Sequence, residues 1–510
     1  MSYSNPLSTA RSLVLLQLLS RILTFALNQT LLRLASPAVF GTAVIQFDLV
    51  CSTILFLSRE GIRNALLRQT DRSGKKGDGE QSQIHKLSII PLRLGLLISS
   101  LVTGVYIWSS SLATTSQDGF WISLALYVLS ALIELFIEPC YIQVHRSTPP
   151  RLNVRMQAEG GMAIVKAFVT FVSLLVLGEQ GALLSFAMGQ VTGASWLAAR
   201  YLQVFKWDIK KLLLSQNVDD ESVFDSQTFS LALANTGQGV IKHVLTESDR
   251  LAVARFSPLD GQGGYAVAMN YGSLVARIVF QPLEESLLLY YSSSLSCSTT
   301  VDLFSMTVRL ALYFASIIRA FVPPLFPALI SFLLPKQYQN TAAPSILKLY
   351  LTSYIPLLCL NGVSESFHTA SANPNEVKLQ AKWMVISSGV FAATLATLAS
   401  TGPIYISKNN GPYNAAILGR EESLVLASCA AMLVRIFYAI RHGKMFFVMR
   451  KPSLRWLSLI PSIKILLWMG IVNLILSLLA NTGRWQRGWK QWAELMGIGG
   501  TLGMFTLGWM

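Results

Sequence analysis

Four polar side chains in one apolar stretch, residues 272–291, are of the kinds that bind charged ligands. They are Arg277, Gln281, Glu284 and Glu285. Their spacing of about four and seven or eight residues places the cation, the amide and one carboxylate on a single helical face, and Pro282 is expected to kink or locally unwind that helix. A charge at the bilayer centre costs at least ~2.5–3.5 kcal/mol, so such groups face a protein interior or water. The stretch carries either an internal Arg–Glu pair that holds helices together or one wall of a polar cavity.

Charged and amide side chains also recur in three earlier apolar segments. They are Arg21 and Asn28 in the first, Arg59, Glu60 and Arg63 in the second, and Glu134 and Glu138 in the fourth. Arg59 and Arg63 are open to a second interpretation, as anchors at the cytosolic end of their helix. The two glutamates lie four residues apart and repel each other unless a cation or a proton intervenes. We expect them to pair with Arg21, Arg59 or Arg63, or else to form an acid–base pair or proton relay.

Two later segments add further charged groups. Residues 241–250 place His243, Glu247 and Arg250 on one face, and Glu365 closes the sequence Asn361-Gly-Val-Ser-Glu365. Two ligands make a poor metal site, so a half-buried, water-facing helix is the favoured interpretation of the first segment. The sequence contains no Walker A, G-x-S-x-G or H-E-x-x-H motif. We therefore predict no enzyme, no catalytic residue, no metal and no cofactor.

The number of charged helices favours a large polar ligand over a single structural salt bridge. Charged groups occur in seven of the predicted helices described below. Arginine predominates among the cations, and its planar guanidinium matches phosphate oxygens in bidentate fashion. The pattern therefore favours a ligand that bears phosphates.

The composition is that of a polytopic membrane protein. Of the 510 residues, 52% are hydrophobic and only 13% are charged, against about 25% charged in soluble domains. The net charge of +15 is interpreted as membrane topology and contact with anionic headgroups, not as nucleic-acid binding. The five cysteines lie in or beside apolar segments without metal spacing, which favours buried free thiols.

About fourteen segments have the ~20 mostly apolar residues that a membrane-spanning helix needs. Their predicted spans are 10–32, 39–60, 86–111, 119–143, 155–177, 181–204, 228–254, 262–291, 302–333, 343–369, 378–400, 412–440, 456–480 and 489–509. Residues 68–85 are predicted to be a disordered loop. The bias of Lys and Arg between loops favours cytosolic termini.

The predicted fold is all-α, with two pseudo-symmetric lobes around a central cavity, an arrangement typical of transporters. The predicted parts are an N-terminal lobe of helices one to six (1–205), a cytosolic linker (206–227), a C-terminal lobe of helices seven to twelve (228–440), and a cytosolic basic loop with helices thirteen and fourteen (441–510).

Several blocks of residues resemble one family, the endoplasmic-reticulum oligosaccharide translocation (Rft) family of the multidrug/oligosaccharidyl-lipid/polysaccharide flippase superfamily. The blocks are Arg21-Ile-Leu-Thr-Phe-Ala-Leu-Asn28, Phe56-Leu-Ser-Arg59-Glu60-Gly-Ile-Arg63, Glu134-Leu-Phe-Ile-Glu138-Pro139, Leu245-Thr-Glu247-Ser-Asp249-Arg250, Gly272-Ser-Leu-Val-Ala-Arg277-Ile-Val-Phe-Gln281-Pro282-Leu-Glu284-Glu285-Ser286 and Asn361-Gly-Val-Ser-Glu365. They follow one another in order from the first to the tenth helix.

The resemblance implies a role in the dolichol pathway of protein N-glycosylation, in the endoplasmic reticulum membrane. The implied activity moves a dolichyl-pyrophosphate heptasaccharide of five mannoses and two N-acetylglucosamines from the cytosolic to the luminal leaflet. The partners would be this glycolipid and the bilayer. The alternatives are an ion-coupled antiporter on the same fold, and a non-transporting accessory factor that binds glycosylation enzymes. If the protein is the translocase itself, the arginines named above would receive the pyrophosphate, and the glutamates would hold those arginines in place.

Overall fold

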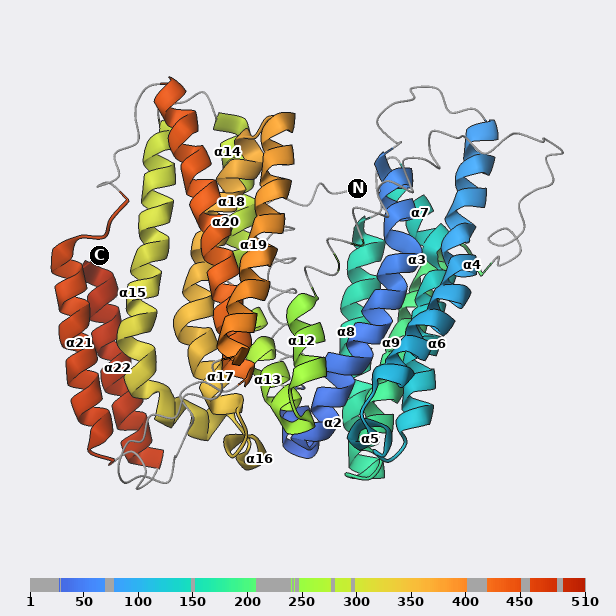
Figure 1. The fold of residues 1–510 in the computed structure, drawn as a ribbon, viewed down its shortest axis with the longest axis horizontal. Coiled ribbons are helices and arrows are strands. Elements are labelled where there is room, and N and C mark those ends of the chain that lie inside the picture. Colours follow the sequence, from blue (N-terminus) through green and yellow to red (C-terminus); the bar gives the residue numbers. More distant parts are fainter. Residues whose placement is uncertain are drawn as a thin grey trace, which may run out of the picture. The chain divides into compact units, whose positions relative to one another are not determined.

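The computed structural model consists of helices throughout its described part (Figure 1). The described residues are 27, 29–68, 78–147, 152–207, 240, 243, 247–276, 280–294, 299–400, 420–450, 459–483 and 489–509. Contacts divide the chain into two compact units, Met1–Arg255 and Phe256–Met510. The all-α prediction is confirmed.

Unit 1 is a bundle in which α8 packs along α9, α9 along α6, and α3 along both α4 and α6. A buried core around Ile137, Cys140 and Tyr201 joins α7, α8 and α9. The elements are α2 (Pro37–Gly41), the π-helix η1 (Thr42–Phe47), α3 (Asp48–Arg68), α4 (Asp78–Ser109), α5 (Leu112–Thr115), α6 (Phe120–Phe136), α7 (Glu138–Arg146), α8 (Leu152–Leu177), α9 (Ala182–Val204) and α12 (Ser248–Phe256), which ends one residue beyond the division.

Unit 2 centres on α18, which contacts α14, α15 and α20, while α19 packs on α20 and α21 on α15. The elements are α13 (Leu259–Val275), α14 (Gln281–Ser294), α15 (Thr299–Leu333), α16 (Lys336–Gln339), α17 (Ala343–Leu349), the π-helix η4 (Tyr350–Tyr354), α18 (Ile355–Ser371), α19 (Pro374–Ser400), α20 (Arg420–Arg450), α21 (Ile463–Asn481) and α22 (Trp489–Trp509).

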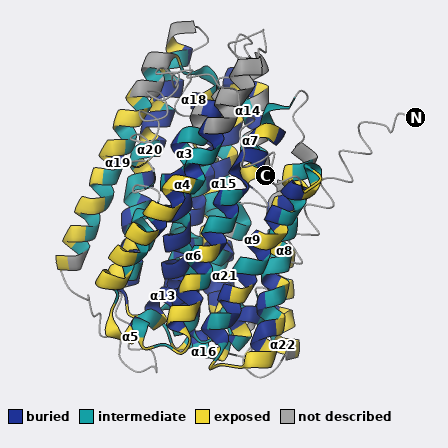
Figure 2. Cartoon of the chain, turned by 90° about the vertical axis from the view of Figure 1, so that its right-hand side faces the viewer, coloured by how far each residue is buried: buried dark blue, intermediate teal, exposed yellow. Residues whose placement is uncertain are grey.

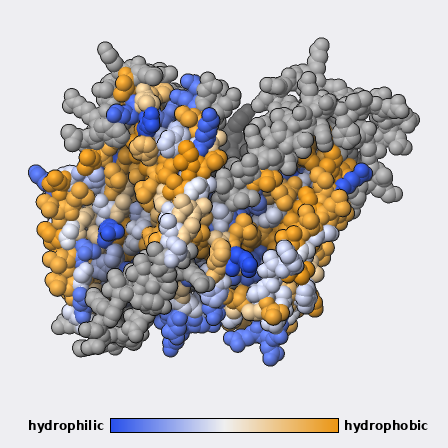
Figure 3. Space-filling model, viewed as in Figure 1, coloured by the Kyte–Doolittle hydropathy of each residue, from blue (hydrophilic) through white to orange (hydrophobic). Residues whose placement is uncertain are grey.

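Within the described residues, ten segments are long and apolar enough to cross a membrane. The chain is therefore a multi-pass membrane protein, and the predicted number of fourteen spans stays a prediction. In two of the ten, 87–109 of α4 and 379–398 of α19, only 22% and 6% of the most apolar window is buried, and both helices show long exposed faces (Figure 2). Hydrophobic side chains cover much of the visible surface of each unit, with hydrophilic ones toward the helix ends (Figure 3). Such outward faces are expected to meet lipid.

Two predicted boundaries are wrong, each at a polar end of a helix. Helix α4 already begins at Asp78, inside the predicted disordered loop, and acidic groups there favour a helix N-terminus. Helix α20 runs on to Arg450, so the first ten residues of the part predicted to begin with a basic loop, 441–510, are helical. Helices extend beyond the apolar segment that crosses the bilayer, and hydropathy does not mark those extensions.

Two helix interruptions fix where the charged side chains lie. Pro139 has no backbone N–H to donate to the carbonyl four residues earlier, and the chain breaks at Ile137 between α6 and α7. In unit 2, Ala276 and Phe280 have π-helical geometry and α14 starts at Gln281. Residues 277–279 lie outside the described part, so the predicted kink or local unwinding stays a prediction, and Pro282 occupies the first turn of α14, which a proline favours.

Candidate functional site

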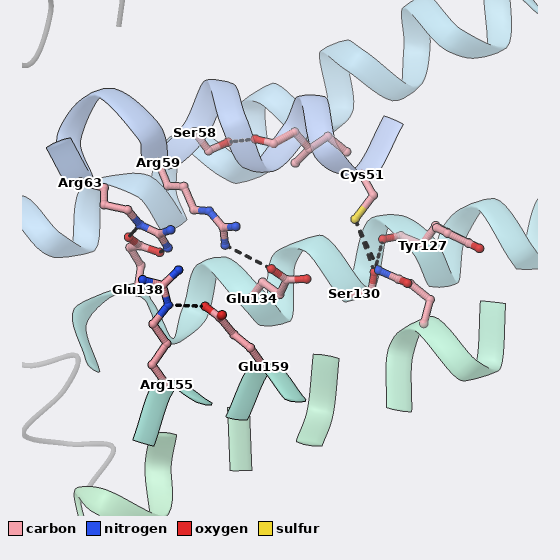
Figure 4. Close-up of polar contacts among 12 residues, drawn as sticks. Cys51, Ser58, Arg59, Arg63, Tyr127, Ser130, Glu134, Glu138, Arg155 and Glu159 are labelled. Atoms are coloured by element: carbon pink, nitrogen blue, oxygen red, sulfur yellow. Dashed lines mark hydrogen bonds and ion pairs between the residues drawn. The ribbon is translucent and has the colours of Figure 1, made fainter. Parts of the chain in front are cut away.

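Two arginines of α3 meet two glutamates of the neighbouring helices in unit 1 (Figure 4). Arg59 Nη1 donates to Glu134 Oε2 at 3.2 Å. Arg63 binds Glu138 through two hydrogen bonds, from Nε at 2.6 Å and from Nη2 at 2.5 Å. Both arginines and both glutamates are four residues apart, so the two pairs form consecutive rungs between helices that run in the same direction. The expected pairing of these glutamates with Arg59 and Arg63 is confirmed.

The second rung is the more enclosed of the two. The Glu138 side chain is 1% exposed and that of Arg63 is 15% exposed. The guanidinium carbon of Arg63 also lies 3.9 Å from the ring centroid of Tyr141, a cation–π contact. A planar guanidinium held by two carboxylate oxygens and an aromatic face is tightly oriented. These contacts place the Arg63 side chain inside the unit, and the alternative of an anchor at the cytosolic end of the helix stays a prediction.

The charged segment near residue 247 contributes to the same unit. The His243 ring stacks on Phe56 of α3 with centroids 4.4 Å apart, and its Nε2 lies 3.1 Å from the Thr53 hydroxyl. Glu247 and Arg250 form an ion pair at 3.3 Å. The favoured interpretation of a half-buried helix agrees with this position. In the part of the chain that the structure describes, no group of three His, Cys, Asp or Glu side chains could hold a metal ion.

Glu365 is the centre of a polar cluster in unit 2. Its Oε2 accepts from Arg435 Nη2 at 2.8 Å and from Asn361 Nδ2 at 2.9 Å, and its Oε1 accepts from Gln380 at 3.4 Å. A small pocket beside these groups is also lined by Trp383. The pair is partly exposed, at 35% for Arg435 and 30% for Glu365. Sequence analysis missed Arg435, although an arginine within a predicted span was a usable signal.

Glu284 of α14 is held against Gly362 of α18. A Cβ atom built on Gly362 would lie 1.7 Å from Glu284 Oε1 and 2.4 Å from its Cδ. The glycine therefore leaves the space that this half-buried carboxylate fills. The Ser366 hydroxyl of α18 donates to the Glu284 backbone carbonyl at 3.3 Å, one turn further along. These contacts therefore join α14 and α18, which overlap the predicted spans 262–291 and 343–369. On α14 they are made by Glu284, within the polar stretch 272–291.

A second buried cluster in unit 2 escaped sequence analysis. His368 Nε2 lies 3.2 Å from the Tyr438 hydroxyl, which donates to the Glu376 backbone carbonyl at 3.1 Å. His442 lies 2.9 Å from the Ser371 hydroxyl and 3.6 Å from the Glu376 carboxylate. The two histidine rings are 4.4 Å apart. No spacing along the sequence links these residues, because they come from three different helices.

The remaining predicted site residues divide into two groups. Glu60 is half-buried on α3 and Gln281 is exposed at the start of α14. Arg21, Asn28 and Arg277 lie outside the described residues, as does the side chain of Glu285. The prediction of buried free thiols is confirmed for Cys51, Cys140, Cys359 and Cys429, and Cys297 lies outside the described residues.

In the described residues, arginines pair with glutamates, either on a neighbouring helix or one turn away in the same segment. Within each unit, arginines and glutamates lie where hydrophobic spans pack, and each described predicted arginine has a carboxylate partner. Burying a charge in this way costs several kcal/mol per ion in desolvation, so a hydrophobic pair of similar volume is often as stable.

Comparisons with known proteins agree with the sequence resemblance. A family model described as Rft protein matches residues 5–509. The Man(5)GlcNAc(2)-PP-dolichol translocation protein RFT1 of Yarrowia lipolytica is 30% identical over 524 residues, covering 92% of this chain and 74% of that protein. The protein of the same name in Schizosaccharomyces pombe is 30% identical over 451 residues, covering 84% and 81%.

The fold is also that of a solved flippase. The lipid II flippase MurJ in its inward closed conformation aligns over 97% of both chains, with a TM-score of 0.62 and 14% sequence identity. At that identity the likeness concerns the fold, and the predicted flippase-like architecture is confirmed. The family match extends over nearly the whole chain, and the protein belongs to the Rft family.

Proposed function

We propose that this protein translocates the dolichyl-pyrophosphate heptasaccharide Man5GlcNAc2 from the cytosolic to the luminal leaflet of the endoplasmic reticulum membrane. The observation that carries the proposal is the match to the Rft family over residues 5–509. Two relatives that are 30% identical to this chain are named as translocation proteins for this glycolipid. The flippase-like fold and the ten candidate spans support a transporter that is not an enzyme.

The arginine–glutamate pairs suggest how a pyrophosphate could be received and released. In the proposed mechanism, Arg59, Arg63 and Arg250 exchange carboxylate partners for phosphate oxygens, since both acceptors suit the guanidinium. Glu134, Glu138 and Glu247 hold these cations when no ligand is bound. Binding then replaces one partner of the guanidinium with another, and the displaced carboxylate must take up a proton or a second cation, because an unpaired buried charge is strongly unfavourable. Arg21, Asn28 and Arg277 are proposed to take part on the strength of the sequence.

The remaining features of the proposal concern topology. We place both termini in the cytosol, a six-helix lobe at 1–205, a linker at 206–227 and a second lobe at 228–440, with the polar residues lining a cavity. The pyrophosphate and sugars would occupy that cavity while the dolichol chain stays in the bilayer. Glycosylation enzymes would be partners under the accessory-factor alternative.

Complementation tests the role in the pathway. Expression of this protein in Saccharomyces cerevisiae depleted of its own RFT1 relative, which is 26% identical to this chain, is expected to restore N-glycosylation of a secreted reporter. Arg63→Gln should fail to restore glycosylation, because the guanidinium that would bind the phosphate is lost. Arg155→Gln, on the exposed face of α8, should complement fully. Failure of the unaltered protein at normal membrane abundance would contradict the proposal.

A further inference from the structure

A groove in unit 2 contains two cations that lack acidic partners. It lies between α15, the α17–η4 segment and α21, and has a volume of about 860 Å³. Arg319 and Lys348 line it and are exposed. Among the described residues, neither side chain has a carboxylate within ion-pair distance, and no Asp or Glu lines the groove. These two cations thus differ from Arg59, Arg63, Arg250 and Arg435, all of which are paired.

The rest of the groove is mainly apolar. Leu312, Leu466 and Met469 form part of its wall, and Leu466 is 38% exposed. A volume of this size lies within the range of about 300–1,000 Å³ that is usual for small-molecule sites. An inorganic anion would use the cations but leave the apolar wall uncovered. A lipid would use both, with its phosphate at the cations and a hydrocarbon chain along the wall.

The depth of the two cations suits a headgroup phosphate. Lys348 lies near the start of the span Ala343–Ser371, and Arg319 lies within the span Thr300–Ser331. At 1.5 Å per residue, they are about 8 Å and about 18 Å from the adjoining ends, Ala343 and Ser331. With each span centred on a hydrocarbon core of about 30 Å, Lys348 lies about at the core boundary and Arg319 about 9 Å inside it. Both side chains line the same groove, and their flexible stems let the charged heads approach a common anion.

The wall of the groove is fixed by a specific contact between α15 and α21. Pro323 and Pro324 have no N–H groups to donate to the backbone carbonyls of Arg319 and Ala320. Asn473 of α21 donates its side-chain N–H groups to these two carbonyls, at 3.4 Å and 2.9 Å. This contact replaces the missing helical hydrogen bonds and holds α21 beside Arg319. These hydrogen bonds therefore fix the position of α21 as one wall of the groove.

We propose that this groove is a binding site for an anionic membrane phospholipid, whose phosphate lies between Arg319 and Lys348 and whose acyl chain follows the wall formed with α21. Basic pockets between membrane helices hold anionic headgroups on the cytoplasmic side. With both termini in the cytosol, as proposed above, the span ends Ser331 and Ala343 are luminal, so this site would take its lipid from the luminal leaflet. The site is distinct from the residues proposed to receive the glycolipid. A bound lipid would place one negative charge between two cations that are otherwise exposed at the level of the membrane.

Native mass spectrometry of the purified full-length protein tests this proposal. With added phosphatidylinositol, the unaltered protein is expected to retain lipid about tenfold better than Arg319→Gln/Lys348→Gln, because charge-assisted hydrogen bonds to the phosphate are lost. The matched control Lys382→Gln/Lys464→Gln removes the same charge from exposed sites outside the groove and should bind as the unaltered protein does. Arg319→Lys, which keeps the charge, should retain most of the binding.

Three results would overturn the proposal. Equal retention by the groove variant and its control would mean that the lipid binds elsewhere. Retention of phosphatidylcholine as strong as that of phosphatidylinositol would mean that no anionic headgroup is selected. Arg319- and Lys348-dependent binding of a polyprenyl phosphate, without binding of phosphatidylinositol, would assign the groove to an isoprenoid lipid instead.

Discussion

Replacing Glu138 by alanine is expected to lower the free energy of unfolding by about 3–5 kcal/mol, because it leaves the enclosed Arg63 cation without its partner. Arg63 gives two hydrogen bonds to Glu138, whose side chain is 1% exposed. Part of this loss can be offset by the Tyr141 ring, since a cation–π contact contributes about 0.5–2 kcal/mol, and by the nearby carboxylate of Glu60. The loss can be measured by unfolding the purified protein with sodium dodecyl sulfate in mixed micelles.

An exposed pair of the same type provides the control. Arg155 and Glu159 form an ion pair at 2.8 Å along α8, with exposures of 45% and 50% (Figure 4). Glu159→Ala should change stability by less than about 0.5 kcal/mol, as exposed pairs of this spacing do. If Glu138→Ala is equally harmless, the carboxylate does not hold Arg63 and this part of the account is wrong.

The double variant Arg63→Met/Glu138→Leu separates the structural role of the pair from a transport role. Removing both charges together leaves no unpaired ion, so stability should recover to near that of the unaltered protein. We nevertheless expect this variant to fail in complementation, since it has no guanidinium at position 63 to donate hydrogen bonds to the phosphate. Full complementation by the stable double variant would make the pair purely structural.

The second large effect is expected from Gly362→Ala in α18. The new methyl group would overlap with three atoms of Glu284, which lie 1.7, 2.4 and 2.9 Å from the Cβ position. Because the overlap reaches Cγ, the carboxylate must move to another rotamer, at a cost of about 1–3 kcal/mol typical of overpacking. Displacement of Glu284 should also abolish complementation, if that carboxylate works in the proposed site. Unfolding in mixed micelles and reporter glycosylation measure the two effects.

Gly389 in α19 is the matched control, because a Cβ atom there would have no neighbour within 4 Å. Gly389→Ala should be neutral or stabilise the helix by up to about 1 kcal/mol. If neither Gly362→Ala nor Gly389→Ala lowers the stability of the protein, Glu284 is not confined by α18. A destabilised Gly362→Ala protein that still complements would show that the position of Glu284 matters for packing alone.

The residues that form the two Arg–Glu pairs of unit 1 were predictable because their spacing is visible in the sequence. Arg59 and Arg63 share the four-residue spacing of Glu134 and Glu138, and an apolar environment leaves such groups few partners other than one another. The meeting of Arg59 and Arg63 with these two glutamates was not predictable, since it depends on α3 packing along α6 and α7. Local spacing gave the candidates, and tertiary packing selected the pairs.

The polar contacts of unit 2 were less accessible from the sequence. Arg435 and Glu365 are 70 residues apart and share no motif. The cluster of His368, His442 and Glu376 likewise forms only when α18, α19 and α20 pack together. Helix ends were misplaced for a different reason: Asp78 and Arg450 lie in helical turns too polar to be counted as part of an apolar span.

Reconstitution into vesicles tests the central claim most directly. The purified protein would be inserted into liposomes that contain Man5GlcNAc2-PP-dolichol, and the fraction of glycolipid accessible from outside would be followed over time. We predict rapid loss of the protected inner-leaflet pool in vesicles that hold the protein, without an ion gradient, and little loss with Arg63→Met/Glu138→Leu. Glycolipid that stays as protected as in protein-free vesicles, with well-folded and correctly inserted protein, would contradict the account.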